Sequence, residues 1–282
     1  MPNKLPIPRI QLGVYMTSGA SCTAAVHTAL SLGYRAIDSA AWYANEGDVG
    51  LGIQQFLASN ASVTRKDIFF TTKLRSNTGY SATRAAIRES IRKSGLGWID
   101  LYLLHSPYGG RAKRWDCWRA VQDAVRDGEV RSAGVSNFGV RHLQELMEDS
   151  AAAAAAAAAG KRDVPITVNQ VEVHPFNTQS AITEFCQAHG IVVEAYAPLV
   201  RGMRMKHPTI VRIARECDVT PAQVLVRWGL QKGFVVLPKS VTMERIRENA
   251  QVSHFELSEG HMEELEALDE HLVTDWDPTD AE

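Results

Sequence analysis

Long apolar runs, basic clusters and closely spaced cysteine pairs are all missing from this chain of 282 residues. No segment approaches the roughly 20 apolar residues needed to span a bilayer, so we expect no membrane partner. The formal net charge is -2 without a long basic block, which argues against nucleic acid as a partner. The four cysteines are scattered without a CxxC pair, and the first residues contain no apolar run that would serve as a secretory signal. These absences predict a cytoplasmic protein with reduced thiols and no metal site.

The chain does contain a repeated alternation of short apolar runs and amphipathic segments. Seven runs resemble buried parallel strands, at residues 34–38, 67–74, 99–106, 130–137, 166–173, 191–198 and 234–240. The segments between them have the pattern of helices, and several end at a glycine. A weak eighth strand is predicted at residues 251–257, followed by a helix over 258–272. Residues 7–15 precede the first unit and are interpreted as a hairpin arm that closes the barrel floor.

Eight strand–helix units in this length predict a single-domain (β/α)8 barrel over residues 1–282, with a short N-terminal β-hairpin. A doubly wound open sheet is the alternative. Such a sheet usually carries a GxGxxG motif after an early strand when it binds a dinucleotide. That motif is missing here, because Gly50 and Gly52 lie in a predicted helix, where we interpret both as packing residues.

A tract of nine alanines at residues 151–159 interrupts this pattern. Alanine has the highest helix propensity, so the tract could extend the preceding helix. It could equally be a disordered low-complexity insert, or alanines that stand for unidentified residues. A functional role is the weakest of these interpretations.

Polar side chains stand where three of the apolar runs end. Asp38, Lys73 and His105 lie at the ends of their runs, and Tyr43 follows Asp38 by five residues. Side chains just past the C-terminal ends of barrel strands converge on one site. The late run LPKSVTMERIREN adds Lys239, Ser240 and Arg245, a set of donors and cations suited to a phosphate. A proton-donating set together with a phosphate clamp indicates hydride chemistry with a phosphorylated dinucleotide.

Seven segments in order resemble the signature blocks of the aldo-keto reductase family: GYRAIDSAAWYANE, TTKL, LYLLHSP, AGVSNF, NQVEVHP, AYAPLVRG and LPKSVTMERIREN. Each block alone is weak, but the resemblance extends from about residue 9 to about residue 277. It implies a monomeric enzyme that reversibly reduces aldehydes and ketones to alcohols with NADPH.

The resemblance implies a catalytic tetrad. Tyr43 would be the general acid, although a free phenol with a pKa of ~10 is a weak donor at neutral pH. Lys73 would stabilise the phenolate and lower that pKa, while Asp38 would keep the buried ammonium charged. His105 would hydrogen-bond the substrate oxygen and orient it.

The resemblance also implies two sets of binding residues. Those for the cofactor are Ser136, Asn137 and Gln170 at the nicotinamide carboxamide, Tyr196 stacked on its ring, Leu199 and Arg201 near the pyrophosphate, Lys239, Ser240, Val241, Thr242 and Arg245 at the 2′-phosphate, and Glu248 and Asn249 at the adenine. Those for the substrate pocket are Tyr15, Trp42, Arg75 and Ser106. With Arg75 and Ser106 in place of tryptophans found in some relatives, the pocket would favour small, polar or anionic carbonyl compounds.

Two other functions are compatible with these residues. A barrel that binds NADPH, senses redox state and turns over slowly would retain the same tetrad. A sugar-phosphate isomerase or aldolase on the same barrel could use Lys73 as a Schiff-base amine.

Overall fold

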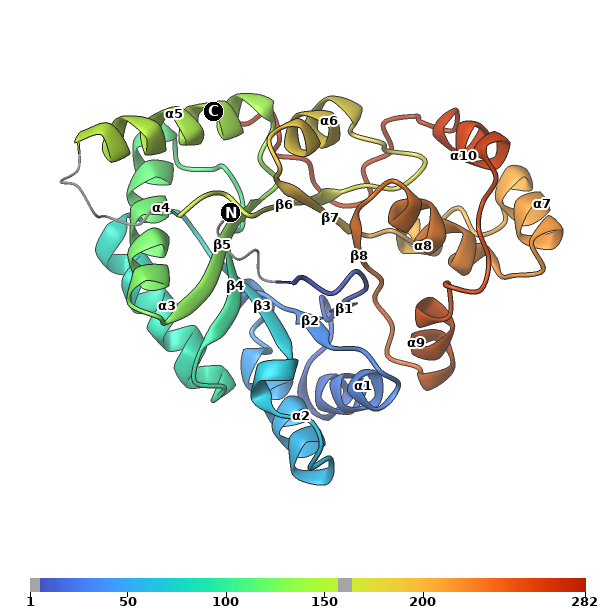
Figure 1. The fold of residues 1–282 in the computed structure, drawn as a ribbon, viewed down its shortest axis with the longest axis horizontal. Coiled ribbons are helices and arrows are strands. Elements are labelled where there is room, and N and C mark those ends of the chain that lie inside the picture. The colour runs from blue at the N-terminus through green and yellow to red at the C-terminus, as the bar shows by residue number, and fades with distance from the viewer. Residues whose placement is uncertain (1–5, 157–163) are drawn as a thin grey trace.

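Parallel strands wind around a common axis in the computed structural model, which describes residues 6–156 and 164–282 (Figure 1). The described strands form one eight-stranded sheet in sequence order, and all neighbours in it are parallel. They are β1 (Leu12–Gly13), β2 (Ala36–Asp38), β3 (Phe69–Leu74), β4 (Ile99–Leu104), β5 (Val130–Ser136), β6 (Val168–Glu172), β7 (Val192–Tyr196) and β8 (Val235–Leu237). The predicted (β/α)8 barrel is therefore confirmed.

Short contacts between β8 and the start of the chain bring the two edges of the sheet together. Ile10 pairs in parallel with Val236. The Val236 amide donates to the Arg9 carbonyl at 2.9 Å, and the Gln11 amide donates to the Val236 carbonyl at 3.0 Å. β1 thus lies between β8 and β2 and nearly closes the barrel.

The position of β1 corrects two predictions. Residues 7–15 were expected to form a hairpin arm, but the described segment supplies the first barrel strand, and Ile7 packs against the apolar cluster inside the barrel. Residues 251–257 were expected to form the eighth strand, and the prediction was wrong. Their backbone carbonyls accept from side chains of the helix before β8, as in the contact from Gln223 Nε2 to Gln251 O at 2.6 Å. Backbone carbonyls that accept these side-chain hydrogen bonds do not pair with a neighbouring strand here.

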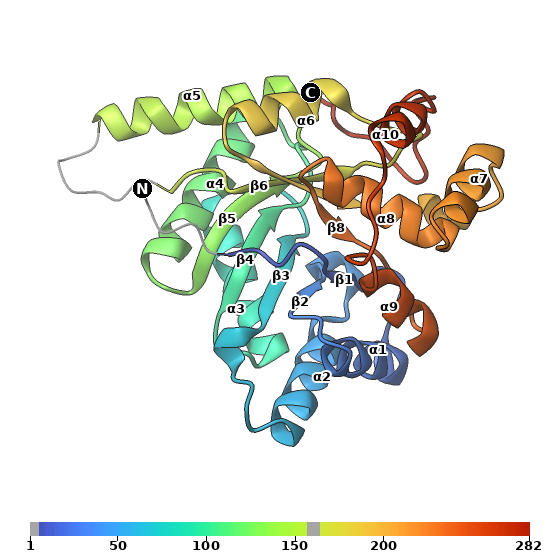
Figure 2. The same cartoon turned by 45° about the vertical axis from the view of Figure 1, so that its right-hand side comes forward.

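Helices surround the strands on the outside of the barrel (Figures 1 and 2). The described helices are α1 (Gly19–Ser31), α2 (Glu46–Ser59), α3 (Tyr80–Ser94), α4 (Arg111–Arg126), α5 (Val140–Ala156), α6 (Ser180–Ala188), α7 (Pro208–Glu216), α8 (Pro221–Gln231), α9 (Met243–Ala250) and α10 (Glu259–Glu266). Three 3-10 turns join them, η1 (Ala41–Tyr43), η2 (Arg65–Asp67) and η3 (Val200–Gly202). Figure 2 shows α9, which follows β8, beside α1 near the start of the chain. None of the described helices is both long and apolar enough to cross a membrane.

Local sequence explains several of these elements. The side chain of Thr220 accepts from the Gln223 amide at the start of α8, and Pro221 occupies the first turn. A Cβ atom added to Gly50 would lie 1.8 Å from the Ser94 carbonyl oxygen, so this glycine allows α2 to pack closely against the end of α3. The packing interpretation of Gly50 is confirmed. The alanine tract continues α5 to Ala156, and residues 157–159 lie outside the described part of the chain.

The strand pattern places polar groups at one end of the barrel. In β4, Leu101 and Leu103 face the inner apolar cluster, while Tyr102 and Leu104 pack with the outer core. His105 follows this strand directly, just as Asp38 ends β2 and Ser136 ends β5. The C-terminal ends of parallel strands meet at one edge, so these side chains share a single region of the surface.

Candidate active site

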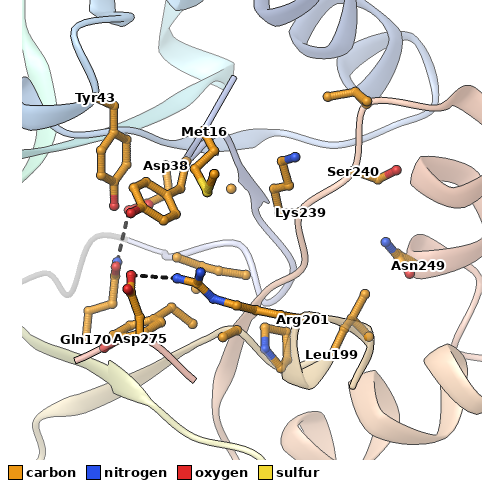
Figure 3. Close-up of a pocket in the computed structure, with 18 of the residues that line it drawn as sticks. Met16, Asp38, Tyr43, Gln170, Leu199, Arg201, Lys239, Ser240, Asn249 and Asp275 are labelled. Carbon is orange, nitrogen blue, oxygen red and sulfur yellow. Dashed lines mark hydrogen bonds and ion pairs between the residues drawn. The ribbon is translucent and has the colours of Figure 1, made fainter. Parts of the chain in front are cut away.

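A cleft of about 970 Å³ lies at the C-terminal ends of the strands. Most residues that the sequence assigned to a site line it: Tyr15, Asp38, Trp42, Tyr43, His105, Ser136, Asn137, Gln170, Tyr196, Leu199, Arg201, Lys239, Ser240, Val241, Thr242, Arg245, Glu248 and Asn249. Figure 3 shows Tyr43, Asp38 and Gln170 toward one end of the cleft, and Lys239, Ser240 and Asn249 toward the other.

A buried ion pair forms the floor of the cleft. Lys73 Nζ lies 2.6 Å from Asp38 Oδ1 and donates to the Ser39 carbonyl at 2.8 Å. The exposed fractions of Lys73 and Asp38 are only 1% and 4%. Burial by itself lowers the pKa of the Lys73 ammonium, but Asp38 together with Tyr43 and Glu194 outweighs it, and the pKa is raised above its ordinary value. Lys73 is therefore a cation, held just behind the cleft wall.

The Tyr43 phenol lies above this cation. Lys73 Nζ is 5.2 Å from the Tyr43 ring centroid, and the ring centroid of His105 lies 5.9 Å from that of Tyr43. Burial raises the pKa of Tyr43, and the charge of Lys73 acts in the opposite direction. The sequence predicts that Lys73 lowers the phenol pKa; its charge acts in that direction, but the effect of burial is larger, so the pKa of Tyr43 is raised.

His105 is a neutral imidazole in this environment. Burial, with the nearby Lys73 cation, lowers the pKa of His105 to about 3. Its Nδ1 is buried without a hydrogen-bond partner among the described residues, while its backbone carbonyl accepts from Asn137 Nδ2 at 3.0 Å. Across the pH range in which proteins work, the ring can donate or accept one hydrogen bond without carrying charge.

Amide and hydroxyl groups from β5, β6 and β7 bond to one another beside the ion pair. Ser136 Oγ donates to the Gln170 backbone carbonyl at 2.9 Å, and Asn137 Nδ2 donates to Ser136 Oγ at 3.1 Å. The Tyr196 hydroxyl donates to Asn137 Oδ1 at 2.9 Å. The Gln170 amide nitrogen donates to Asp38 Oδ2 at 2.9 Å and to Glu194 Oε2 at 2.7 Å. These contacts fix a set of polar groups before any ligand enters.

The opposite end of the cleft carries exposed positive charge. Lys239 and Arg245 line it, and neither forms an ion pair with a carboxylate in the part of the chain that the structure describes. The Thr242 amide donates to Ser240 Oγ at 3.2 Å where α9 begins. The Glu248 carboxylate accepts from the hydroxyl of Thr220, the residue that caps the N-terminus of α8. A set of hydroxyls and unpaired cations at a helix start suits a phosphate dianion.

An ion pair joins the two walls between these ends. Arg201 Nη2 lies 2.6 Å from Asp275 Oδ2, and Figure 3 shows this contact across the cleft. Arg201 belongs to η3, whereas Asp275 belongs to the segment after α10. The pair therefore links the C-terminal segment to the loop after β7.

Trp276 is a pocket residue that the sequence reasoning missed. Its ring centroid lies 6.1 Å from that of His105 and 6.5 Å from that of Trp42, so the three rings enclose the space above the imidazole. Thr274, two residues earlier, bonds through its backbone amide to Glu172 Oε1 at 3.0 Å. In the sequence, Trp276 stands between two aspartates and outside every predicted strand–helix unit. This unusual position was the signal that could have marked it as a pocket residue.

Three predicted residues do not line the cleft. Lys73 lies behind the wall, as a residue that acts on Tyr43 would. Arg75 is exposed, with its guanidinium carbon 5.9 Å from the ring centroid of Trp42, and so stands beside the cleft. Ser106 is buried, and its carbonyl accepts from Asn77 Nδ2 at 2.8 Å. The structure does not bring Ser106 to the pocket wall.

Comparisons with known proteins agree with this geometry. The model of the aldo/keto reductase family matches residues 10–270. An uncharacterized oxidoreductase of Schizosaccharomyces pombe is 42% identical over 276 residues, which is 98% of this chain and 95% of the relative. A glyoxal reductase of Bacillus subtilis is 39% identical over 268 residues, 94% of this chain and 90% of that enzyme. A solved aldo-keto reductase from a Medee basin deep-sea metagenome is 35% identical with a TM-score of 0.86, covering 96% of this chain and 95% of that one.

Proposed function

The chain belongs to the aldo/keto reductase family and is an oxidoreductase, and from this premise we propose that it reduces aldehydes and ketones to alcohols with NADPH, reversibly. The observation that carries the proposal is the buried pair of Lys73 and Asp38 directly behind Tyr43. Besides neutralising Asp38, the Lys73 cation lies where it stabilises a phenolate that forms when Tyr43 gives up its proton.

The cleft residues fit such a dinucleotide. Both hydrogens of the Gln170 amide are engaged by carboxylates, so its oxygen is available to accept from a carboxamide. Tyr196 presents a half-buried ring beside Asn137, and Lys239 and Arg245 present unpaired charge at the other end. When bound, the cofactor supplies a hydride from its nicotinamide ring.

Each tetrad residue then has a separate task. Tyr43 donates a proton to the carbonyl oxygen of the substrate, and Lys73 stabilises the phenolate that remains. Asp38 keeps Lys73 charged. His105, neutral because its pKa is about 3, donates one hydrogen bond to the same oxygen and aims it at Tyr43.

We also propose a class of substrate. Trp42, Trp276 and Tyr15 give the mouth of the cleft apolar walls, and Arg75 stands at its edge with a positive charge. Small reactive aldehydes and dicarbonyl compounds, including anionic ones such as keto acids, fit this combination. The similarity to a glyoxal reductase supports the same class. The monomeric state and the cytoplasmic location remain predictions from the sequence, and size-exclusion chromatography tests the first.

A panel assay tests the function. Small aldehydes, dicarbonyl compounds, keto acids and sugars are offered with NADPH, and the loss of its absorbance is followed with Tyr43→Phe as the matched control. We expect turnover of small aldehydes by the natural chain and almost none by the variant. NADPH binding without turnover of any aldehyde would instead favour the slow redox-sensing barrel. Covalent trapping of a substrate on Lys73 by borohydride would favour the aldolase.

A further inference from the structure

A second buried carboxylate lies inside the barrel next to the tetrad. Glu194 on β7 is completely buried and does not line the cleft. Its Oε2 accepts from Gln170 Nε2 at 2.7 Å, and its Oε1 accepts from Gln11 Nε2 at 2.8 Å. Both bonds that the described residues make to this acid come from neutral amides, and a fully buried carboxylate held in this way is costly to keep in a protein interior.

Gln170 connects this acid to the catalytic ion pair. The same amide nitrogen that donates to Glu194 also donates to Asp38 Oδ2 at 2.9 Å, and Asp38 in turn holds Lys73. A rotated Gln170 amide would place its oxygen against two carboxylates, which is strongly unfavourable. Glu194 and Asp38 together therefore hold the amide with its oxygen toward the cleft.

Few groups determine whether the Glu194 carboxyl is ionised. Burial and the nearby Asp38 carboxylate raise the pKa of Glu194 to about 7, while the bonds from Gln170 and Gln11 and the charge of Lys73 act in the opposite direction. Asp38 on β2 and Lys73 on β3 are the ionisable groups that act on it. The neighbouring segments supply Gln170 from β6 and Gln11 directly before β1, with Val235 of β8 in register, and none of these three ionises.

The structure also accommodates both charge states of Glu194. Gln11 Oε1 is buried without a partner among the described residues. Rotation of the Gln11 amide would let this oxygen accept a hydrogen bond from the carboxyl O–H of a neutral Glu194, without disturbing the contact to Gln170. The ionised form, in contrast, places one extra negative charge below the nicotinamide end of the cleft.

We propose that Glu194 is a positioning residue that fixes the Gln170 amide for the nicotinamide and, when ionised, favours the positively charged oxidised cofactor over the reduced one. The inference rests on the proposed function, because it needs a nicotinamide above Gln170. It concerns the relative affinity for the two forms of the cofactor. A group that only maintained the fold would change both affinities together.

Equilibrium binding of NADP+ and NADPH to the natural chain and to Glu194→Gln, followed by protein fluorescence, tests the proposal. Glutamine at this position keeps an acceptor for Gln170 and can donate to the rotated Gln11, so mainly the charge is removed. At about pH 8 we expect the Kd for NADPH divided by the Kd for NADP+ to be about three- to tenfold lower in the variant. An effect of this size is what one negative charge close to the nicotinamide would produce. Both cofactors carry the same 2′-phosphate, so its own titration cancels in the ratio.

The natural chain gives a second measurement that needs no variant. Its ratio of Kd values for NADPH and NADP+ should fall toward that of Glu194→Gln as the pH decreases to about 6, because Glu194 then takes up a proton. Gln11→Met removes a bond that favours the ionised form of Glu194, so in this variant the ratio should fall at a higher pH than in the natural chain. Equal ratios in the natural chain and Glu194→Gln at about pH 8, or a ratio in the natural chain that does not change with pH, would overturn the inference. Failure of the natural chain to bind either cofactor would instead refute the proposed function.

Discussion

The two ends of the cleft hold their cations in opposite ways. Lys73 is buried, paired with Asp38 at 2.6 Å and bonded to a backbone carbonyl. Lys239 and Arg245 are exposed, and no carboxylate of the described residues pairs with either of them. A buried charge acts strongly on its neighbours because little water screens it, whereas an exposed charge attracts an ion but is weakened by salt. The buried cation is suited to stabilising charge that develops during a reaction, and the exposed cations are suited to reversible binding of a phosphate.

The largest expected effect comes from breaking the buried pair. Lys73→Met leaves Asp38 buried without its cation, so we expect the free energy of unfolding to fall by about 3–5 kcal/mol. We also expect kcat to fall by about 10²-fold or more, since the phenolate loses its counter-charge. Denaturant titration and steady-state kinetics measure the two quantities.

Lys239→Met is the matched control at the open end. An exposed lysine that pairs with no carboxylate of the described chain should, when replaced, change the unfolding free energy by no more than about 0.5 kcal/mol. Equal stability losses in the two lysine variants would contradict the distinction between the two ends.

Tyr43→Phe separates chemistry from binding at the buried end. It removes the donated proton but keeps the ring, so kcat should fall by about 10²- to 10⁴-fold while the Kd for NADPH changes little. Pre-steady-state kinetics measures the loss in the chemical step, and protein fluorescence measures the Kd for NADPH. Near-normal turnover by this variant would remove Tyr43 from the mechanism.

Arg245→Ala tests the open end. A charge-assisted hydrogen bond is worth about 1.5–3 kcal/mol, so NADPH should bind about tenfold or more weakly, with little change for NADH, which lacks the 2′-phosphate. Arg247→Ala is the control, because Arg247 is exposed on the same helix but does not line the cleft. Equal losses for NADPH and NADH would assign Arg245 to the adenine instead.

The smallest effect is expected from breaking the ion pair that lies between the two ends of the cleft. Asp275→Asn breaks the pair with Arg201, in which both side chains are more than a third exposed. Such pairs contribute about 0–1 kcal/mol, so the Kd for NADPH should change by no more than about fivefold. Glu270→Gln, which breaks the neighbouring exposed pair with Arg204, serves as control. A change as large as that of Arg245→Ala would show that the link closes over the cofactor.

Strands with continuous burial were predictable from the sequence. All six residues of β3 and of β4 are buried, and apart from Lys73 and Asp100 they are apolar residues, a tyrosine or threonines. β1 was not predicted because it has only two residues, and because Ile10, just before it, pairs with Val236 near the other end of the chain. The apolar residues Val252 and Leu257 suggested a strand, but they are buried in irregular backbone that α8 side chains hold.

The site was predictable where strand ends position it. The sequence placed Asp38, Tyr43, Lys73 and His105 together because barrel strands end at one edge, and the structure brings them together. Trp276 was not predictable, because its position depends on contacts between Thr274 and Glu172, residues 102 positions apart. Glu194 carried a usable signal that was overlooked, since an acid within the buried run VVEAY requires partners.

The ladder that closes the barrel also constrains how the protein is made. Ile10 pairs with Val236, so the first strand leaves the ribosome long before its partner on β8 exists. Until then β1 can pair only with β2, and the sheet retains an open edge at which newly made chains can associate wrongly. Closure late in synthesis predicts slow folding for a protein of this size and a dependence on chaperones while the last quarter of the chain emerges.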